Sequence, residues 1–289
     1  MQLLLFNAFN GLIQGTFYAL MALGLALILS LNSVINMAHG GFLVIGAYLA
    51  YTLAPYLGFW GALVAGPLGA ALIGLVVERT LVRPLYRRPD PLYTLLLTFG
   101  LALIIQDLAR RIWGPQGLPF QVPAGLDSPV STVLFFITGY RLLVVAITVI
   151  AVAGLYLLLR HTRIGIRIRA GTRDLETVAA LGVNIYRLRA LNFGLGCLLA
   201  GLAGVLAAGV LGLTPPMGAS LVMPSFVAII VGGVGSLVGS ILGGLLIGVA
   251  AGITTTYYPA ASEAVIYLIM LIVLVIRPRG LLGEEGLFE

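Results

Sequence analysis

The sequence contains no lysine, because all sixteen basic residues among its 289 residues are arginine. A phosphate-binding loop of the GxxxxGK[ST] type requires a lysine after its glycines, and Schiff-base catalysis requires an amine. The absence of lysine therefore excludes both a phosphate-binding loop of this type and Schiff-base catalysis. The glycine-rich stretch at residues 233–239 also lies within an apolar run, so we do not interpret it as a nucleotide loop.

Cysteine and histidine are almost as scarce. Cys197 is the single thiol, and His39 and His161 are the only histidines. One cysteine excludes a disulfide framework, and one thiol with two imidazoles does not make a familiar zinc cluster. We therefore expect no metal site.

Charged residues form only 9% of the chain and hydrophobic residues form 60%, whereas a soluble domain carries about 25% charge. This composition excludes an ordinary water-soluble enzyme. Residues 1–77 and 190–262 are uncharged, and each run holds about three crossings at roughly 20 residues per span. Shorter apolar windows at residues 91–106, 142–159 and 264–276 supply one crossing each. The sequence predicts an all-α, polytopic transmembrane bundle of about eight or nine spans, folded as a single domain over residues 1–289.

Residues 223–257 are barely long enough for two full crossings and contain a glycine-rich middle. We expect a short or broken helical hairpin there. Non-helical backbone at membrane depth persists only where protein or a water-filled cavity satisfies its polar groups.

Arginine positions predict the orientation, because cytoplasmic loops are enriched in basic residues. Residues 78–91 and 160–189 are rich in arginine, and Arg277 and Arg279 follow the last span. We place all three regions, including the C-terminus, on the cytoplasmic side. The first 31 residues carry no positive charge and are too long for a signal peptide, so we interpret them as a retained span.

Small residues recur every four positions near the C-terminus. This spacing forms flat helix surfaces that let two backbones approach closely. We assign a helix-packing role to Gly235, Gly239, Gly243, Gly244 and Gly248.

Uncharged polar residues inside apolar runs are candidates for a solute path, although hydrogen bonds between helices explain them as well. Two sets have helical spacing that predicts a shared face. They are Asn7, Asn10 and Gln14 in the first span, and Asn32, Asn36 and His39 after it.

Within residues 160–189, one stretch has the pattern of a short helix. Thr172 or Asp174 can cap its start, and Gly182 can end it in a left-handed conformation. Helical spacing predicts a small apolar face formed by Leu175, Val178, Ala179 and Gly182. Such a helix can dock into a groove of another protein or lie on anionic lipid, and composition favours neither.

The stretch resembles the cytoplasmic coupling loop of ABC importer permeases. Residues 34–42 (VINMAHGGF), residues 98–101 (TFGL), residues 231–252 and residues 276–283 (IRPRGLLG) resemble branched-chain amino acid ABC permeases of the Liv type. The resemblance implies a second homologous permease subunit, two ATP-binding subunits and an external substrate-binding protein in a bacterial inner membrane. It implies that ATPase coupling involves Arg173, Asp174, Leu175, Glu176, Val178, Ala179, Ala180 and Gly182.

The resemblance thus implies a permease subunit that translocates branched-chain or related apolar amino acids by alternating access. We expect no enzymatic activity and no cofactor of its own, since the resemblance assigns ATP and Mg²⁺ to the partner subunits. We expect contact with membrane lipid and none with nucleic acid. The alternatives are an ABC permease for urea, short amides or simple sugars, and a passive channel. An intramembrane hydrolase at Ser220 lacks a plausibly placed histidine.

Overall fold

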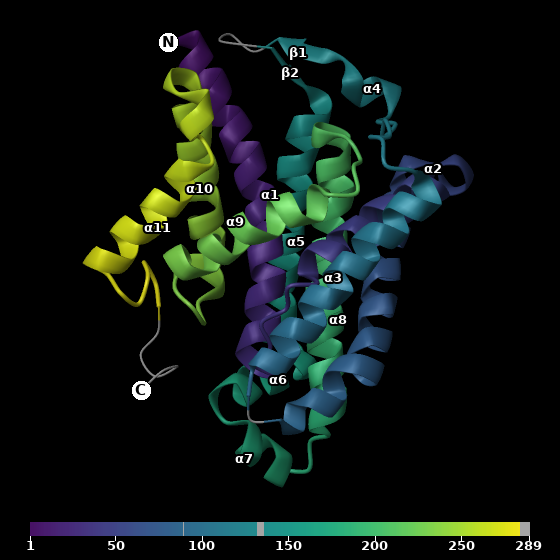
Figure 1. Cartoon of the computed structure of the whole chain (residues 1–289), viewed down its shortest axis with the longest axis vertical. Helices are drawn as coiled ribbons and strands as arrows, with labels where there is room; N and C mark the ends of the chain where they lie inside the picture. The colour runs from purple at the N-terminus through teal and green to yellow at the C-terminus, as the bar shows by residue number, and fades with distance from the viewer. Residues whose placement is uncertain (89, 132–135, 284–289) are drawn as a thin grey trace.

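The computed structural model describes residues 1–88, 90–131 and 136–283, over which the chain forms eleven α-helices. The long helices run between two ends of the molecule (Figure 1). One end holds the N-terminus, and the opposite end holds α6 (Arg163–Arg173) and α7 (Leu175–Ala180). We call these the N-terminal end and the loop end.

Among the residues that the structure describes, six helical segments are long and apolar enough to cross a membrane, and two shorter apolar helices accompany them. The six are α1 (Gln2–Asn32), the segment His39–Tyr86 that begins with α2, α3 (Leu92–Trp113), α5 (Gly139–His161), α8 (Ile185–Leu211) and α10 (Leu237–Tyr257). The shorter pair are α9 (Met217–Gly232) and α11 (Ala264–Ile276).

Helix α2 (His39–Val77) folds back on itself at Gly58, whose φ of 68° and ψ of 173° are not helical. Gly66 packs against Gly46, and Gly74 lies close to Phe42, so the two halves are antiparallel. Each half has about 19 residues and is about 29 Å long, enough for one crossing. With the two halves of α2 counted separately, the described residues contain seven apolar helices long enough to cross and the two shorter helices α9 and α11, which confirms the predicted polytopic bundle. A π-helical turn (Glu78–Val82) and a 3₁₀ turn (Arg83–Arg87) extend the second half.

The predicted hairpin near residues 223–257 is present, with unequal arms. Helix α9 has 16 residues and contains Pro224, whereas α10 has 21 residues and is long enough to cross. The segment after α11 returns to the end of α9, where Leu281 N–H donates to Val231 C=O and Leu282 N–H donates to Gly232 C=O, both at 2.9 Å. The C-terminal segment therefore caps α9.

Helix α1 lies at the centre of the bundle, and nearly every residue from Gly15 to Ile28 is buried. Gly248 of α10 packs directly on the backbone of α1, and Gly244 does the same one turn away. Gly239 and Gly243 face α9 instead. Gly235 differs from the expected helical stripe, because it lies in the turn between α9 and α10 with φ of 92°.

The N-terminal end carries a small addition, which includes two strands that the all-α prediction did not include. A short helix, α4 (Ala124–Asp127), precedes strands β1 (Pro129–Ser131) and β2 (Phe136–Thr138), which pair antiparallel with Pro129 opposite Thr138. Leu118 forms a single bridge with Leu213. These elements lie beyond the ends of the long helices (Figure 1).

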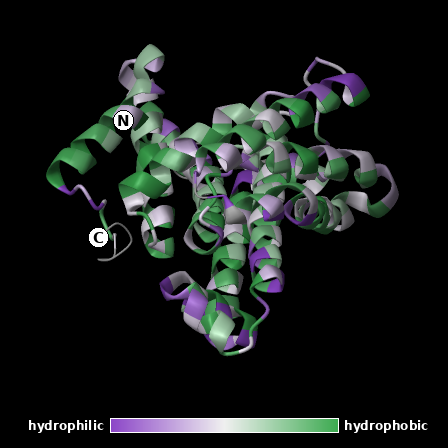
Figure 2. Ribbon diagram, turned by 60° about the horizontal axis from the view of Figure 1, so that its bottom comes forward, coloured by the Kyte–Doolittle hydropathy of each residue, from purple (hydrophilic) through white to green (hydrophobic). Residues whose placement is uncertain are grey.

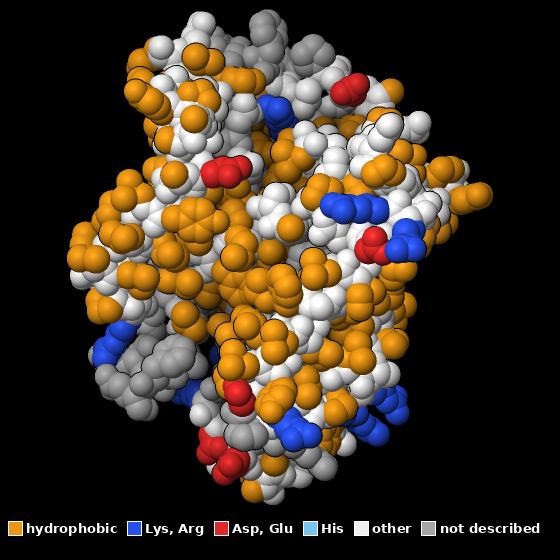
Figure 3. Space-filling model, in the orientation of Figure 1, with side chains coloured by type: hydrophobic (Ala, Val, Ile, Leu, Met, Phe, Trp, Pro, Cys, Tyr) orange, Lys and Arg blue, Asp and Glu red, His pale blue; other side chains and the backbone are white. Residues whose placement is uncertain are grey.

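The surface matches a membrane-spanning bundle. Hydrophobic residues follow most of the length of the long helices (Figure 2). In the space-filling view, charged side chains lie above and below a belt that is mostly hydrophobic (Figure 3).

Candidate functional site

The loop end presents the short helix that the sequence predicted. Asp174 precedes α7, and its carboxylate accepts a hydrogen bond from the Thr177 backbone N–H at 3.0 Å and another from the Thr177 hydroxyl. These donors hold the pKa of Asp174 below its usual value. Gly182 follows the helix with φ of 83°, as expected for a left-handed exit. Asp174 and Gly182 thus fix where α7 begins and ends.

Thr172 does not cap this helix. It lies within α6, where its hydroxyl donates to the Arg169 carbonyl at 2.8 Å. Of the two caps that the sequence offered, Asp174 is therefore the one used, and its extended backbone separates α6 from α7. Residues 160–189 contain two short helices that precede α8.

Two of the four residues in the predicted apolar face of α7 pack on the chain itself. Val178 is only 6% exposed, and Leu175 packs beside Gly171 of α6. These two side chains anchor α7 to its own bundle, whereas Ala179 and Gly182 of the same face are exposed. The exposed residues between 173 and 182 are Arg173, Asp174, Glu176, Thr177, Ala179, Ala180, Leu181 and Gly182. Leu181, which is 77% exposed, was not predicted.

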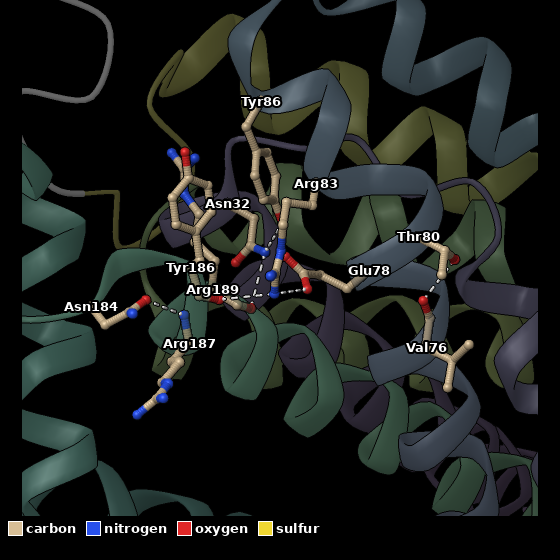
Figure 4. Close-up of polar contacts among 10 residues, drawn as sticks. All are labelled: Asn32, Val76, Glu78, Thr80, Arg83, Tyr86, Asn184, Tyr186, Arg187 and Arg189. Carbon is tan, nitrogen blue, oxygen red and sulfur yellow. Dashed lines mark hydrogen bonds and ion pairs between the residues drawn. The ribbon is translucent and has the colours of Figure 1, made fainter.

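A buried polar cluster lies where the end of α1, the turns that extend α2 and the start of α8 converge (Figure 4). Asn32, at the end of α1, donates to the Tyr86 hydroxyl at 2.7 Å and to the Arg189 carbonyl at 3.2 Å. Asn192 of α8 donates to the Asn32 side-chain oxygen at 2.9 Å and to the Leu27 carbonyl at 2.6 Å. These bonds tie the start of α8 to the end of α1.

An ion pair extends this cluster. The fully buried Glu78 accepts a bond from Arg83 at 3.0 Å, and the Arg83 guanidinium lies 5.5 Å from the Tyr186 ring centroid. The Arg189 guanidinium stacks on Tyr86 at 4.3 Å. Stacking on an aromatic ring and ion pairing hold a planar guanidinium group in a defined orientation. The cluster therefore positions α8 relative to α2.

Most of this cluster was not predicted from the sequence. Asn32 was predicted to line a solute path and Asn192 was not predicted, although an asparagine inside an otherwise apolar run was a usable signal. Glu78 and Arg83 were used only to locate a loop, and sequence spacing does not bring Tyr86 and Arg189 together.

At the N-terminal end, the polar residues of α1 contact neighbouring helices. Asn7 donates to the Thr256 hydroxyl of α10 at 3.1 Å, and Asn10 accepts a hydrogen bond from Arg141 at the start of α5. Gln14 is half-buried on the same helix. Asn7 and Asn10 therefore have partners within this chain.

The predicted helical face of Asn32, Asn36 and His39 does not exist. Helix α1 ends at Asn32, Ser33 adopts a left-handed conformation with φ of 55°, and α2 begins at His39. The structure thus breaks the continuous helix that the spacing assumed.

Asn36 and His39 are fully buried in this break. The imidazole packs on α1, where a Cβ at Gly24 would lie 2.8 Å from His39 Nε2. Within the described residues, no hydrogen-bond partner reaches the Asn36 side chain, whereas the His39 imidazole interacts with the Met21 backbone. Buried polar groups without partners are uncommon, so this break is a second candidate site.

No three His, Cys, Asp or Glu side chains gather as a metal site would require, within the residues that the structure describes. The chain's polar chemistry is therefore concentrated in the polar cluster, in the helix break and on the exposed surface of α7.

Comparisons with known proteins cover nearly the whole chain. The family model described as "Branched-chain amino acid transport system / permease component" matches residues 7–274. The chain is 30% identical to the high-affinity branched-chain amino acid transport system permease protein LivH of Salmonella typhimurium, over 96% of this chain and 94% of LivH. It is 30% identical to BraD of Pseudomonas aeruginosa, with 95% and 94% covered, and 28% identical to LivM of Salmonella typhimurium, with 92% and 67% covered.

Proposed function

The chain belongs to the branched-chain amino acid transport permease family, and on this basis we propose that it carries branched-chain or related apolar amino acids across a bacterial inner membrane. The observation that carries the proposal is the near-full-length match to LivH and BraD, both named as high-affinity branched-chain amino acid permeases. An apolar bundle with few intramembrane charges suits such a solute.

The proposed assembly contains a second permease subunit, two ATP-binding subunits and an external substrate-binding protein. The similarity to both LivH and LivM, which are named as permease proteins of one kind of transport system, supports a pore built from two related chains. The absence of lysine supports an external source of energy, because this chain cannot build a lysine-dependent phosphate loop.

The loop end is proposed to face the cytoplasm, with the C-terminus on the same side. The arginines support this orientation, since Arg110, Arg111 and Arg141 belong to the N-terminal end and the basic loops lie at the other. Because α1 runs from the N-terminal end toward the loop end, the N-terminus then lies outside.

The ATP-binding subunits are proposed to engage the exposed surface of α7. This surface combines an acidic residue, two alanines and an exposed leucine, namely Glu176, Ala179, Ala180 and Leu181. Val178 and Leu175 anchor α7 to the bundle, and Asn192 joins α8 to α1. A displacement of α7 would therefore move α8 and the helices packed on it, which is the coupling that alternating access requires.

The break between α1 and α2 is proposed to border the translocation path. Irregular backbone at membrane depth is tolerated where it is buried in protein or lines a water-filled cavity. The Asn36 amide has hydrogen-bonding capacity that no described residue uses, so a change of conformational state can offer this amide to water or to a solute.

The test is uptake of radiolabelled leucine by the full transporter, with co-purification of the ATP-binding subunits measured in parallel. Glu176→Arg and Leu181→Asp each change the exposed surface of α7 without touching its anchor. Each is expected to reduce both uptake and subunit recovery at least tenfold, while Asp127→Arg, an exposed charge reversal at the N-terminal end, leaves both unchanged. Unchanged uptake and recovery in both α7 variants would refute the coupling proposal.

A further inference from the structure

A groove with a volume of about 570 Å³ lies at the loop end, between the end of α2 and the start of α8. The two helices are antiparallel here, and Gly194 of α8 packs against Leu75 of α2. The groove includes Leu75 of this contact and extends toward the end of α2 and the start of α8. Its lining residues are Leu75, Arg79, Arg83, Asn184, Tyr186, Arg187, Ala190 and Leu191.

The polar half of the groove is basic. Arg83 is already paired with Glu78, which is fully buried. Arg79 and Arg187 have no carboxylate within ion-pair distance among the residues described, and the Arg187 side chain points away from the Glu78–Arg83 pair (Figure 4). The groove therefore contains two cations that no described carboxylate compensates.

The other half of the groove is apolar and continues onto the membrane-facing surface. Leu75, Ala190 and Leu191 line it. The same turns of α2 expose Leu72 and Val76, which are 64% and 61% exposed. A ligand in the groove thus meets arginines at one end and a hydrocarbon surface at the other.

A second groove, of about 490 Å³, continues the basic rim toward α6 and α7. It shares Asn184, Arg187 and Leu191 with the first groove and adds Arg167. Arg187 lines both grooves. A negatively charged group beside Arg187 therefore faces Arg79 in the first groove and Arg167 in the second.

We propose that this groove binds an anionic phospholipid, with the phosphate between Arg79 and Arg187 and an acyl chain along Leu75 and Leu191. Arginine forms charge-assisted hydrogen bonds with phosphate, and basic groups near a membrane surface attract anionic lipid. An acidic soluble partner would satisfy the arginines but would leave the apolar half against lipid, whereas one phospholipid satisfies both halves.

The bound lipid has a structural consequence. It bridges α2 and α8 beside the polar cluster, and α8 directly follows α7 in the chain. Anionic lipid therefore braces the connection between the bundle and α7. This inference concerns lipid alone and does not depend on the solute or on the ATP-binding subunits.

The experiment is native mass spectrometry of the full-length protein purified in mild detergent and titrated with phosphatidylglycerol or phosphatidylcholine. The wild-type protein is expected to retain phosphatidylglycerol at least tenfold more tightly. The double variant Arg79→Gln/Arg187→Gln is expected to weaken that binding about 30-fold, which corresponds to about 2 kcal/mol for two arginines near a membrane surface. Phosphatidylcholine binding should not change.

Two further variants make the test specific. Arg110→Gln/Arg111→Gln removes two charges at the N-terminal end and should bind like the wild type, and Arg79→Lys/Arg187→Lys keeps the charge and should retain most of the affinity. Equal binding of the two lipids by the wild type would overturn the proposal, as would wild-type affinity in the glutamine variant. Displacement of phosphatidylglycerol by inorganic phosphate at millimolar concentration would also overturn it, because the site would then recognise free phosphate.

Discussion

The contact between α1 and α10 offers a sharp test of the packing. Gly248 faces the α1 backbone so closely that an added Cβ would lie 2.5 Å from the Gly11 carbonyl oxygen and from the Gly15 backbone nitrogen. The neighbouring atoms belong to the backbone and cannot rotate away. Gly248→Ala therefore forces the two helices apart.

The size of the effect follows from this geometry. An ordinary Cβ contact needs at least 3.4 Å, so the helices must separate by about 1 Å where they cross. A gap of about 0.5–1 Å already removes a quarter to a half of the attraction of each affected contact. Overpacking of this kind costs about 1–3 kcal/mol, and within a bilayer such close packing is a main source of helix association.

The assay is thermal unfolding of the purified protein in detergent. Gly248→Ala should lower the midpoint by several degrees. Gly154→Ala is the matched control, since Gly154 lies within α5 with no atom within 4 Å of an added Cβ. This control should be neutral or stabilising by up to about 1 kcal/mol through helix propensity. Equal midpoints for the two variants would refute the close contact between α1 and α10.

Three further outcomes are expected. Asp174→Ala removes the cap of α7, so amide hydrogen exchange over the helix should accelerate several-fold. Hydrogen bonds from Thr177 lower the pKa of Asp174 in the folded protein. The wild-type cap is therefore complete above about pH 3.8 and is lost only as the pH falls through that lowered pKa. An unchanged exchange rate at pH 7 would contradict this role. Asn192→Leu leaves two buried acceptors without their donor and should cost about 1–3 kcal/mol by thermal unfolding, and wild-type stability would exclude the bond. Leu281→Pro removes the N–H that bonds to Val231 and should accelerate exchange at the end of α9, whereas exchange at the wild-type rate would mean that the tail does not cap that helix.

The sequence was sufficient for the architecture because the bilayer imposes a strong length and polarity constraint. Uncharged runs located the passes, and arginine-rich segments located their ends. The reversal within α2 was not assigned to a residue, since Gly58 is one of 38 glycines and nothing local marks it as the turn. The short strands at the N-terminal end also lacked a hydrophobic alternation strong enough to be noticed.

The structure of α7 and of the break after Asn32 was only partly predictable, because it depends on tertiary packing as well as on local sequence. Capping is local, so Asp174 and Gly182 could be recognised from their spacing. Which face of α7 points outward depends on tertiary packing, and Val178 turned inward while Leu181 stayed exposed. Because α1 ends at Asn32, Asn36 and His39 do not share the helical face that their spacing predicted.

The most direct test of the account concerns the side and the partner of α7. Cys197 is fully buried, so an Ala180→Cys variant introduces one accessible thiol at the exposed surface of α7. The account predicts that a membrane-impermeant maleimide labels this thiol in inverted membrane vesicles but not in intact cells, and that the ATP-binding subunits protect it. Labelling in intact cells, or labelling that those subunits leave unchanged, would contradict it.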